Sequence, residues 1–246
     1  MKTIKILISL AIICQSVSVS AKQYYGSVFG IRSDGETINT GSLQKAIDYI
    51  STESPGDTLT IWVGRYLTGS VQLKSNVTIM LNEGAIIVGV TSAYDYENVN
   101  GNSAIFLAEG QENIKITGKG VIEGNSRNVA EQYKAQEEKG YIKSAETAKP
   151  SLIAMDKCKN VSVNGIMLQD FCKNAQVYTN CSNVSLDSLI ITGTNANNKG
   201  LIFKNNSDVK ISDCYIQTSG TPIESSDNKN ISASRTITPD GSEVKL

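Results

Sequence analysis

Apolar and polar residues alternate in a short motif that recurs between Asn160 and Ser232. Four copies begin with Asn or Asp and continue with apolar, polar and apolar residues: Asn160-Val-Ser-Val, Asn183-Val-Ser-Leu, Asp208-Val-Lys-Ile and Asn230-Ile-Ser-Ala. The copies start 23, 25 and 22 residues apart, and fainter copies start at Asn76 and Asn113. Alternation is typical of a β-strand, and a fixed period of this length indicates a solenoid. The pattern therefore predicts an all-β, single-domain parallel β-helix with one turn per repeat.

Stacking the repeats in register would align their apolar residues in inward columns. The three expected columns are Val161, Val184 and Val209; Val163, Leu186 and Ile211; and Ile166, Leu189 and Cys214. Burial of each such side chain contributes roughly 1.5–3 kcal/mol. The Asn or Asp before each strand suits a tight corner, because both tolerate the left-handed backbone conformation. An ordinary sandwich of short strands is the alternative, but it does not require whole motifs to recur in register.

The N-terminal part predicts a cap over about residues 22–57. Leu43, Ala46, Ile47 and Ile50 share one face of a helix expected over Thr40–Ile50, with Asn39 or Thr40 as its N-cap. Such a helix would cover the open end of the solenoid. Strands are expected over 58–63, 65–73, 104–109 and 113–122. Residues 125–148, rich in Glu, Lys, Gln and Ala, predict a partly helical excursion from the solenoid.

Residues 1–21 have the pattern of a signal peptide. Lys2 and Lys5 precede an apolar stretch that is too short to span a bilayer, and small residues end it at Ala21. We therefore expect a secreted or periplasmic protein with a mature domain over 22–246 and no membrane span. Without the two lysines the net charge is about −3, which does not favour nucleic acid as a partner.

Histidine is absent from the chain, which removes the commonest general base and metal ligand. Cys158 and Cys181 each precede a repeat Asn by two residues, so they are expected to stack on neighbouring turns. Small buried side chains are the favoured interpretation of these two, Cys172 and Cys214; a Cys158–Cys181 disulfide is the alternative in an oxidising compartment. No close Cys pair indicates zinc, and no cofactor or metal is expected.

Several motifs in order resemble glycoside hydrolase family 28, the polygalacturonase family. They are Ser33-Asp-Gly, Gly64-Arg-Tyr-Leu-Thr-Gly, Leu73-Lys-Ser-Asn-Val-Thr, Ile116-Thr-Gly-Lys-Gly-Val-Ile-Glu-Gly, Lys149-Pro-Ser-Leu-Ile and Cys158-Lys-Asn-Val. The resemblance implies a right-handed β-helix, a pectic and anionic polysaccharide as ligand, and inverting hydrolysis by paired carboxyl groups. It departs at Val63-Gly64, where the family usually has a Pro and one more residue before the Gly.

The family's catalytic residues are largely replaced at the matching positions. Its Asn-x-Asp-Gly falls on Asn197-Asn-Lys199-Gly200, so Lys199 stands where an Asp is usual. Its Asp-Asp falls on Gly220 and Thr221, and its His at best on Asp240. Ile202 stands at a strand position that usually holds an acid, and the family's Arg-x-Lys would lie beyond Leu246. No catalytic residue is therefore assigned, with Asp240 as a tentative one.

Other charged residues could stand in for the missing groups. Asp187, Asp213, Glu224 and Asp227 are the remaining acids of this region, although Asp187 and Asp213 have the pattern of turn residues. Lys199 is either a solvated surface lysine or, with Asn197, part of a binding site for an anionic sugar. In the second interpretation Lys173, Lys204 and Arg235 are further candidates for the same site.

Three hypotheses follow from these replacements: an active pectin-type hydrolase with unorthodox acids, a catalytically inactive β-helix that binds polysaccharide, and an incomplete product of a longer family gene. After Asn230 the alternation fades without an evident cap. An exposed last strand would favour self-association through that end. Asn-x-Ser/Thr sequences fall mostly on repeat corners, so they are interpreted as structural.

Overall fold

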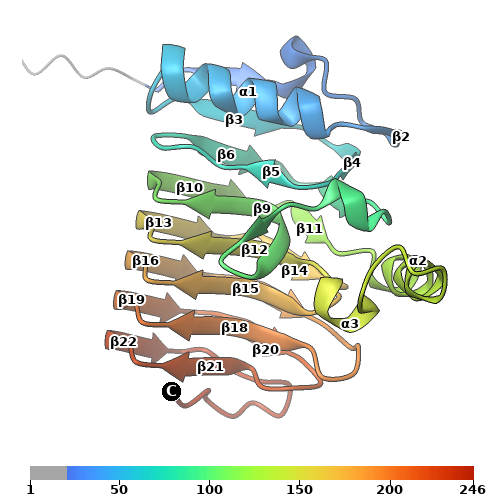
Figure 1. Cartoon of the computed structure of the whole chain (residues 1–246). Coiled ribbons are helices and arrows are strands. Elements are labelled where there is room, and N and C mark those ends of the chain that lie inside the picture. The colour runs from blue at the N-terminus through green and yellow to red at the C-terminus, as the bar shows by residue number, and fades with distance from the viewer. Residues whose placement is uncertain (1–20) are drawn as a thin grey trace, which may run out of the picture.

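A computed structural model describes residues 21–246 and shows a right-handed parallel β-helix built from three sheets (Figure 1). Sheet A contains β1 (Gln23–Tyr25), β3 (Thr58–Ile61), β6 (Thr78–Leu81), β10 (Glu112–Gly118), β13 (Lys159–Asn164), β16 (Ser182–Asp187), β19 (Ser207–Ser212) and β22 (Lys229–Ser234). Sheet B contains β2 (Asp34–Ile38), β4 (Gly64–Thr68), β7 (Ala85–Gly89), β11 (Val121–Glu123), β14 (Met167–Gln169), β17 (Ile190–Thr192) and β20 (Tyr215–Gln217). Sheet C contains β5 (Val71–Gln72), β9 (Asn102–Glu109), β12 (Ser151–Asp156), β15 (Asn174–Thr179), β18 (Lys199–Lys204) and β21 (Ile223–Ser226), while β8 (Asn98–Val99) pairs antiparallel with β9.

The predicted inward columns are present in the core. Val161, Val184 and Val209 are direct partners on successive strands of sheet A, and Val163, Leu186 and Ile211 are partners two residues further on. All nine residues of the three columns are at most 2% exposed. Period-two alternation places these side chains inside the coil, and the repeat spacing then stacks like on like.

Asparagine residues at or just before the start of the sheet A strands from β6 onward form a ladder along the stack. Each repeat Asn or Asp has a left-handed backbone, with φ between 53° and 60°. The side-chain amide of each Asn donates to the residue one turn earlier at 2.8 Å: Asn113 to Asn76, Asn160 to Asn113, and Asn183 to Asn160. Asp208 cannot donate and interrupts the series, which resumes when Asn230 donates to Asp208 at 3.0 Å. These Asn side chains are therefore engaged in the fold, as the sequence predicts.

A helix closes the N-terminal end of the stack, as predicted. Helix α1 (Thr40–Glu53) is longer than expected and follows the 3-10 turn η1 (Gly26–Phe29). Its apolar face is buried, and it lies across the first turns (Figure 1). Asn39 occupies the N-cap position, but its side chain bonds to the backbone of Arg32 and Thr37 instead of capping the helix.

Two predicted strands are each divided by a corner. Residues 65–73 split into β4 and β5 around Gly69, where a Cβ would lie 2.2 Å from the carbonyl oxygen of Asp95. Residues 113–122 split into β10 and β11 at Gly118, whose φ is 120° and whose Cβ would lie 2.0 Å from the oxygen of Leu81. Only glycine fits the close backbone approach at these two corners. The apolar–polar alternation continues through both glycines, so the pattern alone did not predict the bends.

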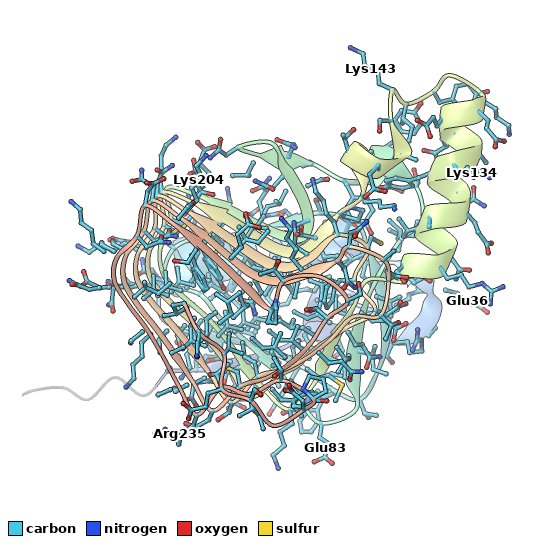
Figure 2. All side chains as sticks on the ribbon, turned by 90° about the horizontal axis from the view of Figure 1, so that it is seen from below. Glu36, Glu83, Lys134, Lys143, Lys204 and Arg235 are labelled. Atoms are coloured by element: carbon cyan, nitrogen blue, oxygen red, sulfur yellow. The ribbon has the colours of Figure 1, made fainter. Side chains whose placement is uncertain are left out.

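The segment 125–148 leaves the solenoid between β11 and β12. It contains α2 (Ser126–Glu138) and α3 (Ala145–Ala148) and projects from one corner of the coil (Figures 1 and 2). A second excursion carries η2 (Ala93–Asp95). Val129 and Tyr133 of α2 pack on Cys172 of the solenoid, which anchors the helix there. No helix within residues 21–246 is long and apolar enough to cross a membrane; the expected signal peptide lies, except for Ala21, outside the described residues.

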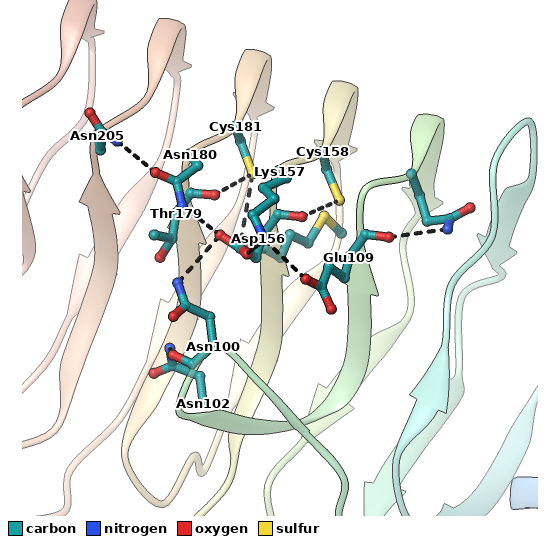
Figure 3. A network of polar contacts seen from close by, with 12 residues as sticks. Asn100, Asn102, Glu109, Asp156, Lys157, Cys158, Thr179, Asn180, Cys181 and Asn205 are labelled. Carbon is teal, nitrogen blue, oxygen red and sulfur yellow. Dashed lines mark hydrogen bonds and ion pairs between the residues drawn. The ribbon is translucent and has the colours of Figure 1, made fainter.

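A polar network occupies the corner between sheets C and A (Figure 3). The carboxylate of Asp156, 2% exposed, accepts hydrogen bonds from the amides of Asn180 at 2.8 Å and Asn100 at 3.3 Å and pairs with Lys157 at 3.3 Å. Cys158 and Cys181 stack beside it on neighbouring turns, as predicted. Among the described residues all four cysteines are buried free thiols, in keeping with the favoured interpretation of small core side chains.

Candidate functional site

The predicted site positions meet at the corner between sheets B and C. Asn197 and Lys199 enter β18, and Gly220 and Thr221 enter β21 on the next turn. The amide of Gly220 donates to Asn198 at 2.9 Å, and the amide of Gly200 donates to Thr221 at 3.1 Å. The structure therefore brings these four residues together on two neighbouring turns.

The backbone at this corner explains two of the residue choices. Asn197 has a φ of 63°, a left-handed conformation that Asn tolerates well. A Cβ at Gly220 would lie 2.6 Å from the carbonyl oxygen of Asn198. A carboxyl-bearing side chain at position 220 therefore requires a backbone displacement, and Thr221 beside it is exposed.

Lys199 forms an ion pair with an acid of the following turn. Its amine lies 2.5 Å from the carboxylate of Glu224 in β21, and the two side chains are 39% and 47% exposed. The carboxylate of Glu224, on the turn after the expected catalytic position, is thus paired with a cation. Ile202, at the other position where an acid is usual, packs on the apolar outer cluster formed by Leu107, Ala154 and Val177.

Asp240, the tentative catalytic residue, is part of a local turn. Its carboxylate accepts hydrogen bonds from the hydroxyl of Thr238 at 2.6 Å and from the backbone and hydroxyl of Ser242 at 3.1 Å. The bond from Thr238 is the main cause that lowers the pKa of Asp240. No hydrogen bond or ion pair within residues 21–246 joins it to Lys199, Gly220 or Thr221.

The other stand-in residues are distributed over different corners. Asp213 forms a bidentate pair with Arg235 at 2.5 and 2.6 Å, and this bonding lowers the pKa of Asp213. Asp187 accepts hydrogen bonds from Ser188 and Ser212. Both acids lie at the end of sheet A strands, away from Lys199. Figure 2 places Arg235 and Lys204 at two different points of the coil's outline. Lys204 ends the strand β18 that Lys199 begins, and Arg235 pairs with Asp213, so neither joins Lys199.

Lysines do recur at the corner that holds Lys199. Lys149, Lys173 and Lys199 precede or begin β12, β15 and β18, and these strands pair directly through Ser151, Asn174 and Lys199. The amide of Lys199 donates to the carbonyl oxygen of Lys173 at 3.0 Å. Adjacent strands lie about 4.8 Å apart, so three lysines from successive turns line the same edge.

A pocket of about 250 Å³ adjoins this edge. Its walls come from the excursion and from the turn before β18, and its lining residues are Ser126, Ala130, Glu146, Lys149, Cys172, Asn195, Ala196 and Asn197. Burial is the main cause that raises the pKa of the Cys172 thiol to about 12. This thiol therefore lines the pocket as an uncharged group. Sequence reasoning missed Glu146 and Lys149 because they meet Asn197 only when the excursion folds back; the one available signal was Lys149 within a family-like motif. It missed Asn195, two residues before Asn197, because no motif marks that position.

No group of three or more His, Cys, Asp or Glu residues in the described part of the chain could hold a metal ion. The chemistry of the corner is therefore that of lysine amines, side-chain amides and two ion-paired carboxylates.

The chain belongs to the glycosyl hydrolases family 28, whose model matches residues 56–241. It is 27% identical to an exo-poly-α-D-galacturonosidase of Dickeya chrysanthemi over 79% of this chain, and it spans 40% of that relative's length. The prediction of the family from sequence motifs is confirmed.

Solved structures show the same fold. A protein of Parabacteroides merdae ATCC 43184, described as a candidate glycosyl hydrolase, superposes with a TM-score of 0.86 at 42% identity, covering 92% of this chain and 99% of that one. The family 28 exopolygalacturonase of Yersinia enterocolitica gives 0.72 at 25% identity, covering 83% and 45%. PfbA, a surface adhesin of Streptococcus pneumoniae, gives 0.60 at 18% identity over 79% and 50% and shares the fold alone.

Proposed function

We propose that this protein binds an anionic, pectin-type polysaccharide at the corner between sheets B and C and does not hydrolyse it by the two-carboxylate mechanism. The observation that carries this proposal is the Lys199–Glu224 ion pair at 2.5 Å, at the point where the family places an acid. Inverting hydrolysis needs one carboxyl group to protonate the leaving oxygen and another to activate water. Gly220 and Thr221 supply neither.

The cost of these replacements is large. General acid–base assistance contributes typically about 10²–10⁴-fold to the rate for each group. A family member without both groups therefore retains the surface that recognises the polymer and loses most of the chemistry. The names of the Dickeya and Yersinia relatives refer to action on polygalacturonate, which supports a galacturonate polymer as the ligand.

The lysine edge supplies a basis for binding. Lys149, Lys173 and Lys199 precede or begin neighbouring strands of sheet C, at positions that shift by one residue from each turn to the next, so three lysines from successive turns lie near this corner. Carboxylates repeated along a uronate polymer would meet these amines. A neutral polymer would gain no ion pairs there, which favours the anionic ligand.

Two assays test the proposal together. Purified protein is incubated with polygalacturonate, and release of reducing sugar is measured beside an Asp240→Asn variant; retardation in a polygalacturonate-containing native gel measures binding. We expect retardation without release. Release that the Asp240→Asn variant abolishes would instead assign Asp240 to catalysis, and release that survives in the variant would direct attention to Asp187, Asp213, Glu224 or Asp227. Absence of retardation would reject the polymer as ligand.

Two further expectations remain proposals. Secretion or export to the periplasm rests on the pattern of residues 1–21, and fractionation of the producing cells tests it. Self-association rests on β22, which pairs with β19 at one edge while Ile237 near the same end is 38% exposed. A concentration-dependent mass in light scattering would support it, and a constant monomer mass would reject it.

A further inference from the structure

The pocket beside the lysine edge has the size and chemistry of a site for one acidic sugar. Its volume of about 250 Å³ corresponds to roughly eight water molecules at about 30 Å³ each. One pyranose ring with its substituents fits this space.

Charge in the pocket is arranged as a displaceable ion pair. The amine of Lys149 lies 2.6 Å from the carboxylate of Glu146, and the Lys149 side chain is 22% exposed while that of Glu146 is 73% exposed. Lys149 is held by the start of β12, next to buried Pro150 and Ser151. Glu146 is carried by α3, a helix of four residues. The cation is thus fixed in the pocket wall, and its counter-ion can leave toward solvent.

Hydrogen-bonding groups complete the opposite wall. The amide nitrogen of Asn195 donates to the carbonyl oxygen of Phe171 at 3.0 Å, which leaves its side-chain oxygen to accept a hydrogen bond. Asn197 is exposed and adjoins it. Sugar hydroxyl groups both donate and accept, so amide side chains are suitable partners for them, and the amine of Lys149 favours a carboxylate.

We propose that this pocket binds a single hexuronate residue, whose carboxylate replaces Glu146 as the partner of Lys149. The inference rests on the proposed function, because it assigns the acidic sugar of that polymer to a particular pocket. Glu146 then acts as an internal competitor: it neutralises Lys149 when the pocket is empty and lowers the affinity for the ligand.

Because Glu146 competes with the ligand for Lys149, substitutions of Lys149 and Glu146 should change the affinity for the ligand in opposite directions. Binding of trigalacturonate is measured by calorimetry for the parent protein and for the variants Lys149→Met, Glu146→Gln and Lys143→Met. Lys149→Met should weaken binding about tenfold, since a hydrogen bond to a charged group is worth about 1.5–3 kcal/mol. Glu146→Gln should strengthen binding several-fold. Lys143→Met, on an exposed lysine that projects from the same excursion (Figure 2), should leave it unchanged.

The outcomes separate the pocket from the wider proposal. A gain of affinity in Glu146→Gln cannot come from misfolding. The proposal therefore remains testable even if Lys149→Met is destabilised. Parent-like trigalacturonate binding by Lys149→Met and Glu146→Gln would overturn the pocket assignment; polygalacturonate retardation that persists would leave the proposed function intact. If the parent protein binds neither trigalacturonate nor polygalacturonate, both are overturned. Equal binding of galactotriose, which has no carboxylates, would overturn the role of Lys149.

Discussion

The amine of Lys199 lies 2.5 Å from the carboxylate of Glu224, and the two residues come from neighbouring turns of sheet C. Lys199 is the residue that the motif comparison aligns with an acid of the family, and in the structure it is paired with the carboxylate of Glu224. Both side chains are substantially exposed, so their pairing contributes little to folding. Exposed ion pairs are worth about 0–1 kcal/mol.

Breaking this pair should change binding more than stability. Lys199→Met and Glu224→Gln should each lower the free energy of unfolding by less than about 1 kcal/mol in urea denaturation. Lys199→Met should reduce retardation by polygalacturonate, because one amine of the lysine edge is lost, whereas Glu224→Gln should maintain or increase it. A loss of several kcal/mol in either variant would show that the pair is structural.

Reintroducing acids at the family positions should meet a steric limit. Gly220→Asp should destabilise the protein by about 1–3 kcal/mol, because its Cβ would lie 2.6 Å from the oxygen of Asn198. Thr221→Asp is exposed and should be nearly neutral. The midpoint of thermal unfolding, measured for both variants, should therefore be lower for Gly220→Asp than for Thr221→Asp. Equal midpoints would mean that the backbone at this corner shifts enough to accommodate a side chain at position 220.

Repairing the asparagine ladder should stabilise the solenoid. Asp208→Asn would supply the missing donor to Asn183 while its oxygen still accepts from Asn230, for a gain of about 0.5–1 kcal/mol. The same change in an Asn183→Ala background is the control, because it keeps the backbone preference at position 208 and removes the acceptor. A similar gain in both variants would assign the effect to backbone preference instead of to the ladder.

The buried carboxylate of Asp156 should be important for stability. Asp156→Ala leaves the amides of Asn180 and Asn100 without their acceptor (Figure 3). Loss of a buried hydrogen-bond partner costs about 1–3 kcal/mol. Urea denaturation should show a loss in this range, against less than about 0.5 kcal/mol for Glu109→Ala, whose side chain is 57% exposed. Equal losses would contradict the network's role.

Acid should destabilise the N-terminal region through Asp34. Hydrogen bonds from the backbone and hydroxyl of Thr37 lower the pKa of Asp34 from 3.8 to about 2. Because the folded-state pKa is the lower one, the unfolded state takes up the proton first. The stabilisation is present above pH of about 4 and is lost as the pH falls to about 2.

The difference in stability between the parent protein and Asp34→Asn should therefore shrink over this pH range. Urea denaturation of both proteins at several pH values measures it. A difference that does not change with pH would show that the charge of Asp34 has no role.

The sequence by itself determined the solenoid, its inward columns, its corner asparagines and its family. Val161, Val184 and Val209 could be aligned from spacing alone because parallel strands stack in register and each side chain faces the residue one period away. Which residues stand at the family's catalytic positions stays a prediction from the motif comparison.

Only the tertiary structure decided which charges meet. The pairing of Lys199 with Glu224 and the separation of Arg235 from both depend on which corner each residue occupies. The pocket of Glu146, Lys149 and Asn195 arises where a polar excursion without the repeat pattern folds back on the coil. The position of such a segment is set by packing, here Val129 and Tyr133 against Cys172, and packing between distant segments has no periodic signal in the sequence.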